Sequence, residues 1–360
     1  MQKKKLLILT PYYPSPIDKL NGVFVKQQID LIKKNFSQVI IFKYKSVNTR
    51  SFLSEIYKNK LSYNDDNVKI YNFFYFDNSL VSKIFSDRMK ALRIQIKFNY
   101  YFRFLFLINF DVVLSQWILP TVYVFGFLQK KKRKIISIVR GMDTTILKDM
   151  FPQYLKQAII SSDVIVGNGQ YVTQFIRNIH QESIVETIYN PKVLNVFLDG
   201  EILQKKNIKN EFVFTCVGRF DGSKRQDLLV KIIFLLAAKG IKVKLNLIGT
   251  GKDVDNIKKL AYSSDVGESV VFLSDLTHKQ ISEVYRNTDI YLQPSMREGV
   301  PNALAEAMAS GCCCIARNVG GVADLIDDKL NGYLFEKDDE LFTLIMKILE
   351  TDTLNVRMLA

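Results

Sequence analysis

The chain has 360 residues, of which 48% are apolar and 24% charged, a composition that is typical of globular proteins and excludes a disordered chain. No apolar run reaches the roughly 18 residues that a membrane-spanning helix needs, and the length exceeds what one hydrophobic core usually serves, so we expect two domains. The net charge of +14 lies in the first 200 residues, which hold 29 Lys and Arg against 14 Asp and Glu, whereas residues 201–360 hold 21 against 22. This asymmetry predicts an anionic partner for the N-terminal half, such as a membrane surface, a phospholipid-linked acceptor or nucleic acid.

Apolar, β-branched runs alternate with segments of helical period along the whole chain, a pattern typical of parallel sheets covered by helices. The first run follows three lysines, but it is too short for a signal peptide and lacks a cleavage site, so we interpret it as a strand. The strands predicted for a first sheet are Leu6–Thr10, Val39–Lys43, Val112–Ser115, Ile135–Val139 and Val164–Val166. Those predicted for a second sheet are Phe212–Val217, Val243–Ile248, Val270–Leu273, Ile290–Gln293 and Cys312–Ala316.

The two series of strands predict an α/β protein with two Rossmann-like, doubly wound domains. We place an N-terminal domain at residues 1–197 and a C-terminal domain at residues 211–360. Residues 198–210 are rich in lysine and asparagine, contain Gly200 and lack a strong period, so we predict a linker there. Doubly wound domains bind ligands beyond the carboxyl ends of their strands, which predicts a deep cleft that both domains face.

Three loops of the N-terminal half follow predicted strands and carry candidate binding residues. Gly22 lies after the first strand, just before a helix that we expect to begin near Val23. Gln116 follows the strand at Val112–Ser115, and Arg140 and Asp143 follow the strand at Ile135–Val139. An ordinary turn at Gly22, with acceptor or structural contacts but no catalytic role for Gln116 and Arg140, is the alternative interpretation.

A basic, amphipathic segment extends from Lys83 to Arg103, and a basic run follows at residues 130–134. Its apolar residues recur at helical spacing and its lysines recur every seven residues on another face: Phe85, Met89, Leu92 and Ile96; Lys83, Lys90 and Lys97. The pattern predicts peripheral attachment to an anionic membrane surface, although a core helix with a solvated lysine face explains it equally well. No nucleic-acid recognition motif accompanies the charge, so we expect no nucleic-acid partner.

In the C-terminal half, the strand at Phe212–Val217 runs into Gly218 and Arg219, and Lys224 lies five residues beyond Arg219. Two cations beyond the carboxyl end of a strand suit a diphosphate, which Arg219 can grip through its planar guanidinium. Gly249 and Gly251 end the next strand and would let the backbone approach a ligand. A simple turn explains a lone Gly-x-Gly as well.

The most informative stretch extends from Ser295 to Gly311. Pro301 lies where a helix would begin and Gly311 where it would end, which predicts a strand-to-helix loop whose backbone N–H groups suit an anion. The residues of this anion-binding loop are Gly299, Val300, Pro301, Asn302 and Ala303. Glu298 and Glu306 would lie in the loop and about two turns into the helix, and their carboxylates suit the vicinal hydroxyls of a ribose or hexose. The alternative is a capped amphipathic helix with two solvated glutamates.

In this order and spacing, the motifs resemble those of the group 1 glycosyltransferases, a family of retaining enzymes with the GT-B fold. The matching motifs are Val217-Gly218-Arg219 with Lys224, Ile248-Gly249-x-Gly251, Glu298-Gly299-x-Pro301 with Glu306-Ala307, Gly320-Gly321, and Asn331 to Phe335. The pair Glu298 and Glu306 corresponds to the E-x7-E motif of that family.

The resemblance implies a role for each donor-side residue. Arg219 and Lys224 would neutralise the donor diphosphate, while Glu298 and the amides of residues 299–303 would hold the donor sugar and the distal phosphate. Glu306 would bind the ribose, and Ser274 would lie at the edge of the base. Arg225 departs from the family, which usually has glycine after the lysine, and we expect a tighter turn there.

On the acceptor side, Gly22 fits a family glycine loop close to the diphosphate. The family strand that ends in histidines has Leu114 and Gln116 here, and Arg140 replaces the histidine of a His-Gly-x-Asp loop. Without those histidines, we expect a front-face mechanism in which the leaving phosphate takes the acceptor proton. Arg219, Lys224 and Arg140 would stabilise the charge that develops, while Asp143 and Gln116 would position the acceptor hydroxyl.

We therefore predict a retaining glycosyltransferase that moves a hexose or N-acetylhexosamine from a nucleotide-sugar, a UDP- or GDP-sugar, to a lipid-linked or oligosaccharide acceptor of bacterial surface polysaccharide. We expect no metal and no cofactor, because Asp253-x-Asp255 opens a helix and is better explained as capping. Four cysteines, three of them adjacent, offer no disulfide framework, which favours the cytoplasm, with peripheral attachment to the inner face of the membrane.

Two other functions remain open from the sequence. A nucleotide-sugar-binding subunit that has lost catalysis is motivated by the missing histidines, whereas a sugar-nucleotide epimerase would need acid and base residues that we do not find. The chain ends at Ala360, soon after a helix predicted at Leu341–Leu349. Family members usually continue into a helix that crosses back to the first domain, so we expect either that the chain is truncated or that this crossover is missing.

Overall fold

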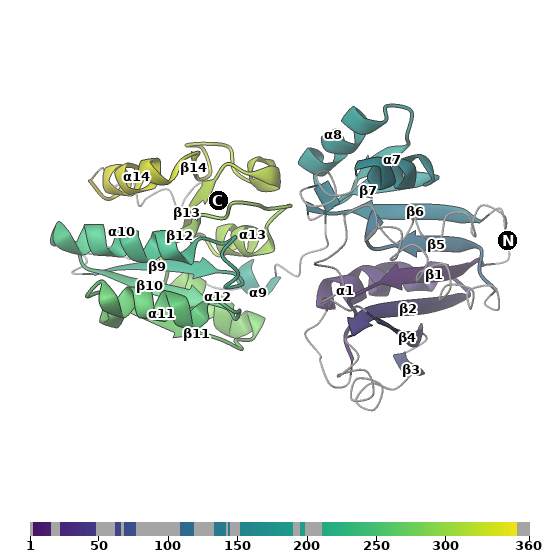
Figure 1. The fold of residues 1–360 in the computed structure, drawn as a ribbon, viewed down its shortest axis with the longest axis horizontal. Helices are drawn as coiled ribbons and strands as arrows, with labels where there is room; N and C mark the ends of the chain where they lie inside the picture. The colour runs from purple at the N-terminus through teal and green to yellow at the C-terminus, as the bar shows by residue number, and fades with distance from the viewer. Residues whose placement is uncertain are drawn as a thin grey trace. The chain divides into compact units, whose positions relative to one another are not determined.

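The computed structural model describes residues 3–15, 22–47, 62–65, 68–76, 109–118, 133–141, 143–144, 152–189, 195–198 and 211–350. The chain divides into two compact units, Met1–Pro191 and Lys192–Ala360. Each unit consists of a sheet of mostly parallel strands with helices packed against it (Figure 1). The predicted α/β class with two doubly wound sheets is confirmed.

The sheet of the first unit has the strand order β3-β4-β2-β1-β5-β6-β7-β8, in which only the pairing of β3 with β4 is antiparallel. Its strands are β1 (Lys5–Thr10), β2 (Gln38–Val47), β3 (Ser62–Asp65), β4 (Val68–Phe76), β5 (Val112–Ser115), β6 (Lys134–Val139), β7 (Val164–Gly167) and β8 (Val185–Thr187). The described helices are α1 (Val23–Ile32), η1 (Lys33–Asn35), α7 (Pro152–Ile160) and α8 (Gln170–Ile179). The strand order reverses between β1 and β5, so these two neighbours form the topological switch point of this sheet.

Alternation of side chains explains the two layers of the first unit. Leu6 and Ile8 of β1 point to one face, where they pack with Val25 and Ile29, which lie four residues apart on α1. The opposite face carries a second cluster, in which Val139 of β6 packs with residues of α7 and α8. Strands buried on both faces are apolar throughout, which is why β1 reads as a continuous apolar run.

The sheet of the second unit is parallel throughout, with the order β11-β10-β9-β12-β13-β14. Its strands are β9 (Phe212–Val217), β10 (Val243–Ile248), β11 (Val270–Leu273), β12 (Ile290–Gln293), β13 (Cys313–Arg317) and β14 (Tyr333–Phe335). Its helices are α9 (Asn195–Leu198), α10 (Gln226–Ala238), α11 (Val254–Ser263), η4 (Gly267–Ser269), α12 (His278–Arg286), α13 (Asn302–Ala309), η5 (Gly320–Asp324) and α14 (Asp338–Glu350). Here the order reverses between β9 and β12.

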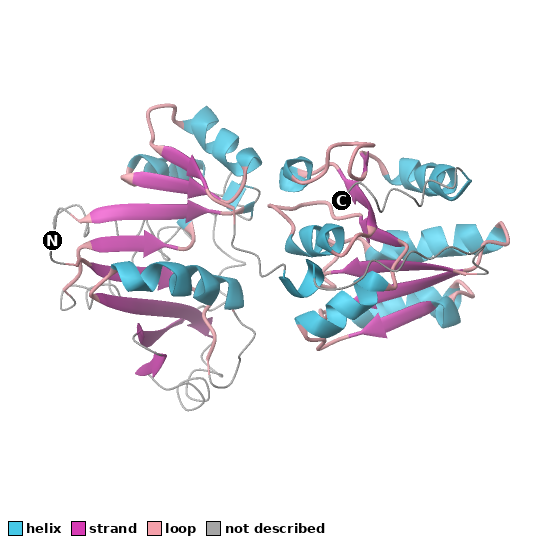
Figure 2. Ribbon diagram, turned by 180° about the vertical axis from the view of Figure 1, so that it is seen from behind, coloured by secondary structure: helices cyan, strands magenta, loops and turns pink. Residues whose placement is uncertain are grey.

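Two apolar layers enclose this sheet, and Figure 2 shows helices on either side of its strands. One layer joins residues of α10, α11 and α14 to the sheet, including Leu229, Ala261 and Ile345. The other layer joins residues of α9, α12 and α13, including Phe197 and Leu304. All four cysteines are buried and free, so none takes part in a disulfide.

Every strand predicted from the sequence is present, with ends displaced by at most a few residues, and the sequence analysis missed β3, β4, β8 and β14. The units separate between Pro191 and Lys192 rather than at residue 197, because α9 packs against α12 and α13. Most of the predicted linker and the whole basic segment from residue 83 to residue 103 lie outside the described residues. Among the helices that are described, none is both long and apolar enough to cross a bilayer.

Two predictions about helix ends need correction. Pro301 is the N-cap of α13 rather than its first residue, and Glu306 is the fifth residue of the helix, little more than one turn in. Asp253 does lie at the N-cap of α11, but its side chain makes no capping hydrogen bond. Gly311 has φ +73 just beyond the C-cap of α13, as expected of a glycine that ends a helix.

Candidate active site

The candidate donor residues gather at one edge of the second sheet. Because all six strands are parallel, the loops that follow them leave from the same edge. Residues 218–225 follow β9 and residues 294–301 follow β12, and these two strands are the neighbours at which the strand order reverses. Crevices outside the carboxyl ends of strands at such a point are where open α/β sheets bind ligands.

An ion pair joins the two loops at this point. Lys224 Nζ lies 2.6 Å from Glu298 Oε1, and the Glu298 side chain is only 8% exposed. The side-chain amide of Gln293, at the end of β12, also donates to Glu298 Oε1, and the Tyr291 hydroxyl donates to Gln293 Oε1 at 2.6 Å. The carboxylate is therefore held by a cation from the loop after β9 and by an amide from the end of β12, which gives it a fixed orientation.

The thiol of Cys216, near the end of β9, interacts electrostatically with both Lys224 and Glu298. Burial raises the pKa of Cys216 to about 12, with Lys224 lowering it and Glu298 raising it by smaller amounts. A thiol with such a pKa stays protonated at neutral pH, so this cysteine has no nucleophilic role in the site.

Two glycines of the loop after β10 are required by a neighbouring backbone. Gly249 has φ +145, and a Cβ there would lie 2.1 Å from the carbonyl oxygen of Gly218. Gly251 has φ +159, and a Cβ there would lie 2.2 Å from the carbonyl oxygen of Phe220. The loops are joined by hydrogen bonds from the Gly218 N–H to Ile248 O and from the Phe220 N–H to Thr250 O. These glycines therefore support the loop that carries Arg219 and Lys224.

Gly320 and Gly321 support the loop that carries Glu298 in the same way. A Cβ on Gly320, which has φ +58, would lie 2.0 Å from the Glu298 carbonyl oxygen, and a Cβ on Gly321 would lie 2.5 Å from that of Gly299. The Gly321 N–H donates to Gly299 O at 2.8 Å. This glycine pair is one of the motifs that carry the family resemblance, and no role was predicted for it from the sequence.

The remaining donor candidates lie on the same edge. Arg219 is exposed, and within the described part of the chain its guanidinium makes no hydrogen bond, so it can reach a ligand. Ser274 follows β11, is exposed and donates to Asp275. Glu306 is half-buried on α13, whose first turn follows the loop of residues 299–301.

Arg225 does not simply tighten the turn, as the sequence analysis expected. It has φ +53 and ψ +40, the left-handed backbone conformation that a glycine at this position would be expected to adopt. The helix α10 begins with the next residue, Gln226, whose side chain donates to Arg219 O. The backbone around Lys224 is therefore fixed by the turn at Arg225 and by the hydrogen bond from Gln226 to Arg219 O.

The candidate acceptor residues lie at the carboxyl edge of the first sheet. The Arg140 guanidinium is buried and donates to the main-chain oxygen of Gln116 at 3.1 Å and to its side-chain oxygen at 2.6 Å. Arg140 also donates to Gln28 of α1 at 3.3 Å, and its backbone N–H donates to Asp143 Oδ2 at 2.9 Å. The structure thus brings Gln116, Arg140 and Asp143 into one buried network.

Burial shifts both charged groups of this network. It raises the pKa of Asp143 to about 7, against hydrogen bonds from the Arg140 and Ile118 backbones and the charge of Arg140 that lower it. It lowers the pKa of Arg140 to about 10, against the charge of Asp143 that raises it. A carboxyl group that titrates near neutrality can exchange a proton during a reaction, which is an unusual property for an aspartate.

Three aromatic rings adjoin the network, and the sequence analysis missed them. The Arg140 guanidinium stacks on Phe24 at 4.8 Å and on Trp117 at 5.0 Å, and the exposed Tyr12 ring lies 5.1 Å from the Trp117 ring. Gly22 packs against this group, since a Cβ there would lie 2.6 Å from the Tyr12 carbonyl carbon. Tyr12 and Trp117 follow β1 and β5, the pair of strands at the switch point of this sheet. Their place directly after these two strands is the sequence feature from which the aromatic group could have been predicted.

Two buried amide atoms on this edge have no hydrogen-bond partner in the described part of the chain: Gln116 Nε2, after β5, and Asn168 Oδ1, after β7. One is a donor and the other an acceptor, and native proteins rarely leave such groups unmatched. Among the residues that the structure describes, no group of three His, Cys, Asp or Glu side chains could hold a metal ion.

Comparison with known proteins places this geometry in context. Residues 199–359 match the family model described as glycosyl transferases group 1. An uncharacterised glycosyltransferase of Methanocaldococcus jannaschii is 26% identical over 98% of this chain and 91% of its own length. The UDP-Gal:α-D-GlcNAc-diphosphoundecaprenol α-1,3-galactosyltransferase of Escherichia coli is 28% identical over 64% of this chain and 54% of its own length. The sucrose-phosphate synthase structure from Thermosynechococcus elongatus superimposes with a TM-score of 0.75 over 99% of this chain and 94% of its own, at 16% identity, which shows a shared fold.

Proposed function

We propose that this chain acts as a group 1 glycosyltransferase, which transfers a hexose or N-acetylhexosamine from a UDP- or GDP-sugar, with retention, to a lipid-linked or oligosaccharide acceptor. The observation that carries the proposal is the pairing of Lys224 with Glu298 across the switch point of the second sheet. A nucleotide-sugar presents a diphosphate next to a ring of hydroxyls, and this site places a cation next to a fixed carboxylate.

Each donor-side residue takes a role that its surroundings support. Lys224 and the exposed Arg219 bind the diphosphate, the backbone N–H groups at the start of α13 bind the distal phosphate, and Glu298 accepts from hydroxyls of the sugar. Glu306 accepts from the ribose, and Ser274 lies at the edge of the base. A UDP-sugar is favoured by the name of the galactosyltransferase relative, which includes UDP-Gal.

The reaction follows from these contacts. The bond between the sugar C1 and the phosphate oxygen breaks, with its electron pair going to the phosphate, while the acceptor oxygen bonds to C1 on the same face. The acceptor proton passes to the departing phosphate oxygen, so no protein base is required. Lys224 and Arg219 stabilise the charge that builds up on the diphosphate, which is the largest contribution that such a site can make.

The edge of the first sheet supports recognition of a sugar acceptor. Aromatic rings such as Tyr12 and Trp117 offer apolar faces for a pyranose ring, and the unmatched amide atoms of Gln116 and Asn168 suit hydroxyl groups. The Arg140 guanidinium stacks on the Trp117 and Phe24 rings, and Asp143 accepts a hydrogen bond from the backbone N–H of Arg140. The positive charge of the first 200 residues suits an acceptor on an anionic lipid, at the inner face of a membrane.

A direct experiment tests this function. The purified chain is screened for thermal stabilisation by UDP-, GDP- and ADP-sugars, and the best donor is incubated with diphosphate-linked lipid acceptors. NMR of the product then reports the anomeric configuration. Transfer with the configuration of the donor supports the proposal, inversion refutes retention, and donor binding without hydrolysis or transfer supports the rival function, a binding subunit that has lost catalysis.

A further inference from the structure

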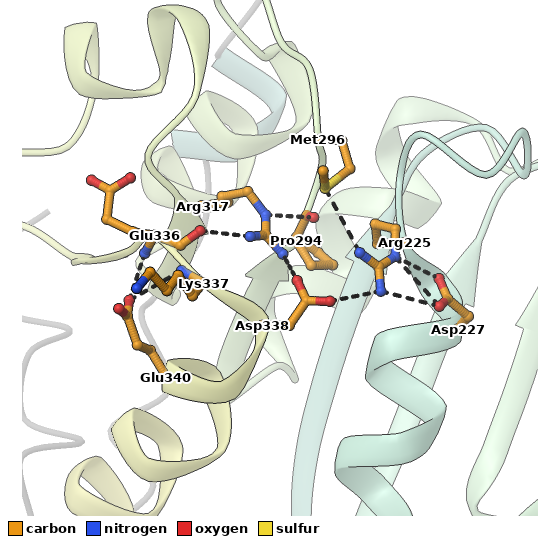
Figure 3. A network of polar contacts seen from close by, with 9 residues as sticks. All are labelled: Arg225, Asp227, Pro294, Met296, Arg317, Glu336, Lys337, Asp338 and Glu340. Carbon is orange, nitrogen blue, oxygen red and sulfur yellow. Dashed lines mark hydrogen bonds and ion pairs between the residues drawn. The ribbon is translucent and has the colours of Figure 1, made fainter.

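A network of polar contacts joins residues next to Lys224 and Glu298 in the sequence, and Figure 3 shows its members. At its centre is Asp338, the first residue of α14, whose two carboxylate oxygens bind two different arginines. Asp338 Oδ2 accepts from Arg225 Nη2 at 2.8 Å, and Asp338 Oδ1 accepts from Arg317 Nη2. One carboxylate thus joins a residue of the loop after β9 to a residue at the end of β13.

Arg225 reaches both loops of the site. It follows Lys224 directly, and its guanidinium binds Asp227 through Nε at 3.1 Å and approaches the Met296 sulfur at 3.7 Å. Its backbone is held at φ +53, where residues other than glycine are strained. A glycine would adopt this conformation more easily, so an arginine here carries a local strain cost, and its side-chain contacts are what it adds.

Arg317 anchors the start of the second loop. Its side chain is 6% exposed, stacks on the Phe335 ring at 4.8 Å, and donates from Nε to the carbonyl oxygen of Pro294 at 3.3 Å. It also donates to Glu336 O at 2.7 Å. Pro294 opens the loop that carries Met296 and Glu298, so Arg317 fixes that loop at its base.

We propose that Arg225, Asp338 and Arg317, here called the two-arginine clamp, position Lys224 against Glu298 for the donor. The clamp ties residues 218–225 to residues 294–298, and a backbone hydrogen bond from the Met296 N–H to Ser223 O reinforces it. Asp227 and Asp338 also neutralise the guanidiniums of Arg225 and Arg317. This inference rests on the proposed function, and Arg225 and Asp338 act as positioning residues.

The test uses Arg225→Gly, which keeps the backbone conformation and removes the clamp, and Asp338→Asn, which removes the charge of the bridge. Lys329→Gly is the matched control, because Lys329 also has a positive φ of +64 but its side chain is 75% exposed and pairs only with Asp328. Hydrogen exchange followed by mass spectrometry reports on residues 219–225 and 294–299. We expect faster exchange in both loops for the two clamp variants and wild-type exchange for the control.

Kinetics separate positioning from general stability. Because a small misplacement of a catalytic group is costly, we expect the clamp variants to lose about 10-fold to 100-fold in kcat, with a donor KM within about threefold of wild type. In a Lys224→Ala background the same substitutions should cause a clearly smaller loss of kcat, since the clamp acts in part through Lys224 and in part through the loop of Glu298.

Unchanged exchange at residues 294–299 in both clamp variants overturns the clamp, and so does a loss of kcat in the Lys224→Ala background that is as large as in the wild type. Faster exchange together with a smaller loss in that background supports the clamp. If the wild-type chain turns over no nucleotide-sugar, the proposed function fails, while the exchange measurement still decides whether the clamp orders the two loops.

Discussion

Replacement of Lys224 by alanine is the sharpest test of the donor site. The Lys224 ammonium lies 2.6 Å from Glu298 Oε1. A donor phosphate bound at this site would therefore lie within about 4 Å of the ammonium. Two unit charges at about 4 Å interact by about 4 kcal/mol at an effective dielectric constant near 20. The loss of one such group that stabilises charge in the transition state typically lowers kcat by about 100-fold to 1000-fold. The Lys224 side chain is 22% exposed, so solvent screening favours the lower figure, about 100-fold.

The same substitution leaves the Glu298 carboxylate, 8% exposed, with Gln293 as its remaining side-chain partner. Loss of one partner of a buried group costs about 1–3 kcal/mol of stability, so part of any lost activity could come from unfolding. Thermal denaturation of each variant controls for this, and Lys239→Ala, which removes an exposed lysine at the end of α10, is the matched charge control.

The assay measures the release of nucleoside diphosphate at saturating donor, for the wild type, Lys224→Ala and Lys239→Ala. We expect the first variant to fall about 100-fold in kcat and the second to remain at the wild-type rate. A folded Lys224→Ala protein with kcat within threefold of wild type would refute the electrostatic role of this residue, and with it the reasoning that joins the ion pair to diphosphate departure.

Other predictions concern the supports of both edges. Gly320→Ala should lower the denaturant midpoint far more than Gly240→Ala, because the new Cβ would lie 2.0 Å from Glu298 O, whereas Gly240, with φ +77, has open space and costs only about 1 kcal/mol of strain. The folded-state pKa of Asp143, about 7, lies above the ordinary aspartate value of 3.8, because burial disfavours its charge. The unfolded state therefore binds fewer protons between these pH values, and stability should fall as pH rises from about 4 to 7, by at most about 1.4 kcal/mol per pH unit. Urea denaturation at pH 5 and pH 7 should show that Asp143→Asn reduces this slope, and an unchanged slope would contradict the assignment. Tyr12→Ala should raise the acceptor KM about fivefold and leave the donor KM unchanged, since an aromatic stacking contact is worth about 1 kcal/mol, and equal changes in both KM values would contradict an acceptor role.

The candidate site could be predicted from the sequence wherever its signal is local. The glycine and proline positions around Glu298 and the cations beyond Val217 follow strands whose apolar runs are visible in the sequence, so their shared edge could be inferred. The aromatic group of Tyr12, Phe24 and Trp117 was missed because each residue reads as an ordinary core aromatic when it is taken alone. Only the adjacency of β1 and β5 brings Tyr12 and Trp117 together.

The sequence by itself determined two parallel α/β units and the order of the donor motifs, because hydrophobic period and turn residues act over a few neighbouring positions. The tertiary structure decided which loops meet. It places β9 beside β12, so that Lys224 pairs with a glutamate 74 residues away and Arg225 with an aspartate 113 residues away. It also decided that Gly249 and Gly251 accommodate a neighbouring backbone. Strand order and close approach of distant backbones are set by how whole layers pack, and no local pattern along the chain encodes that choice.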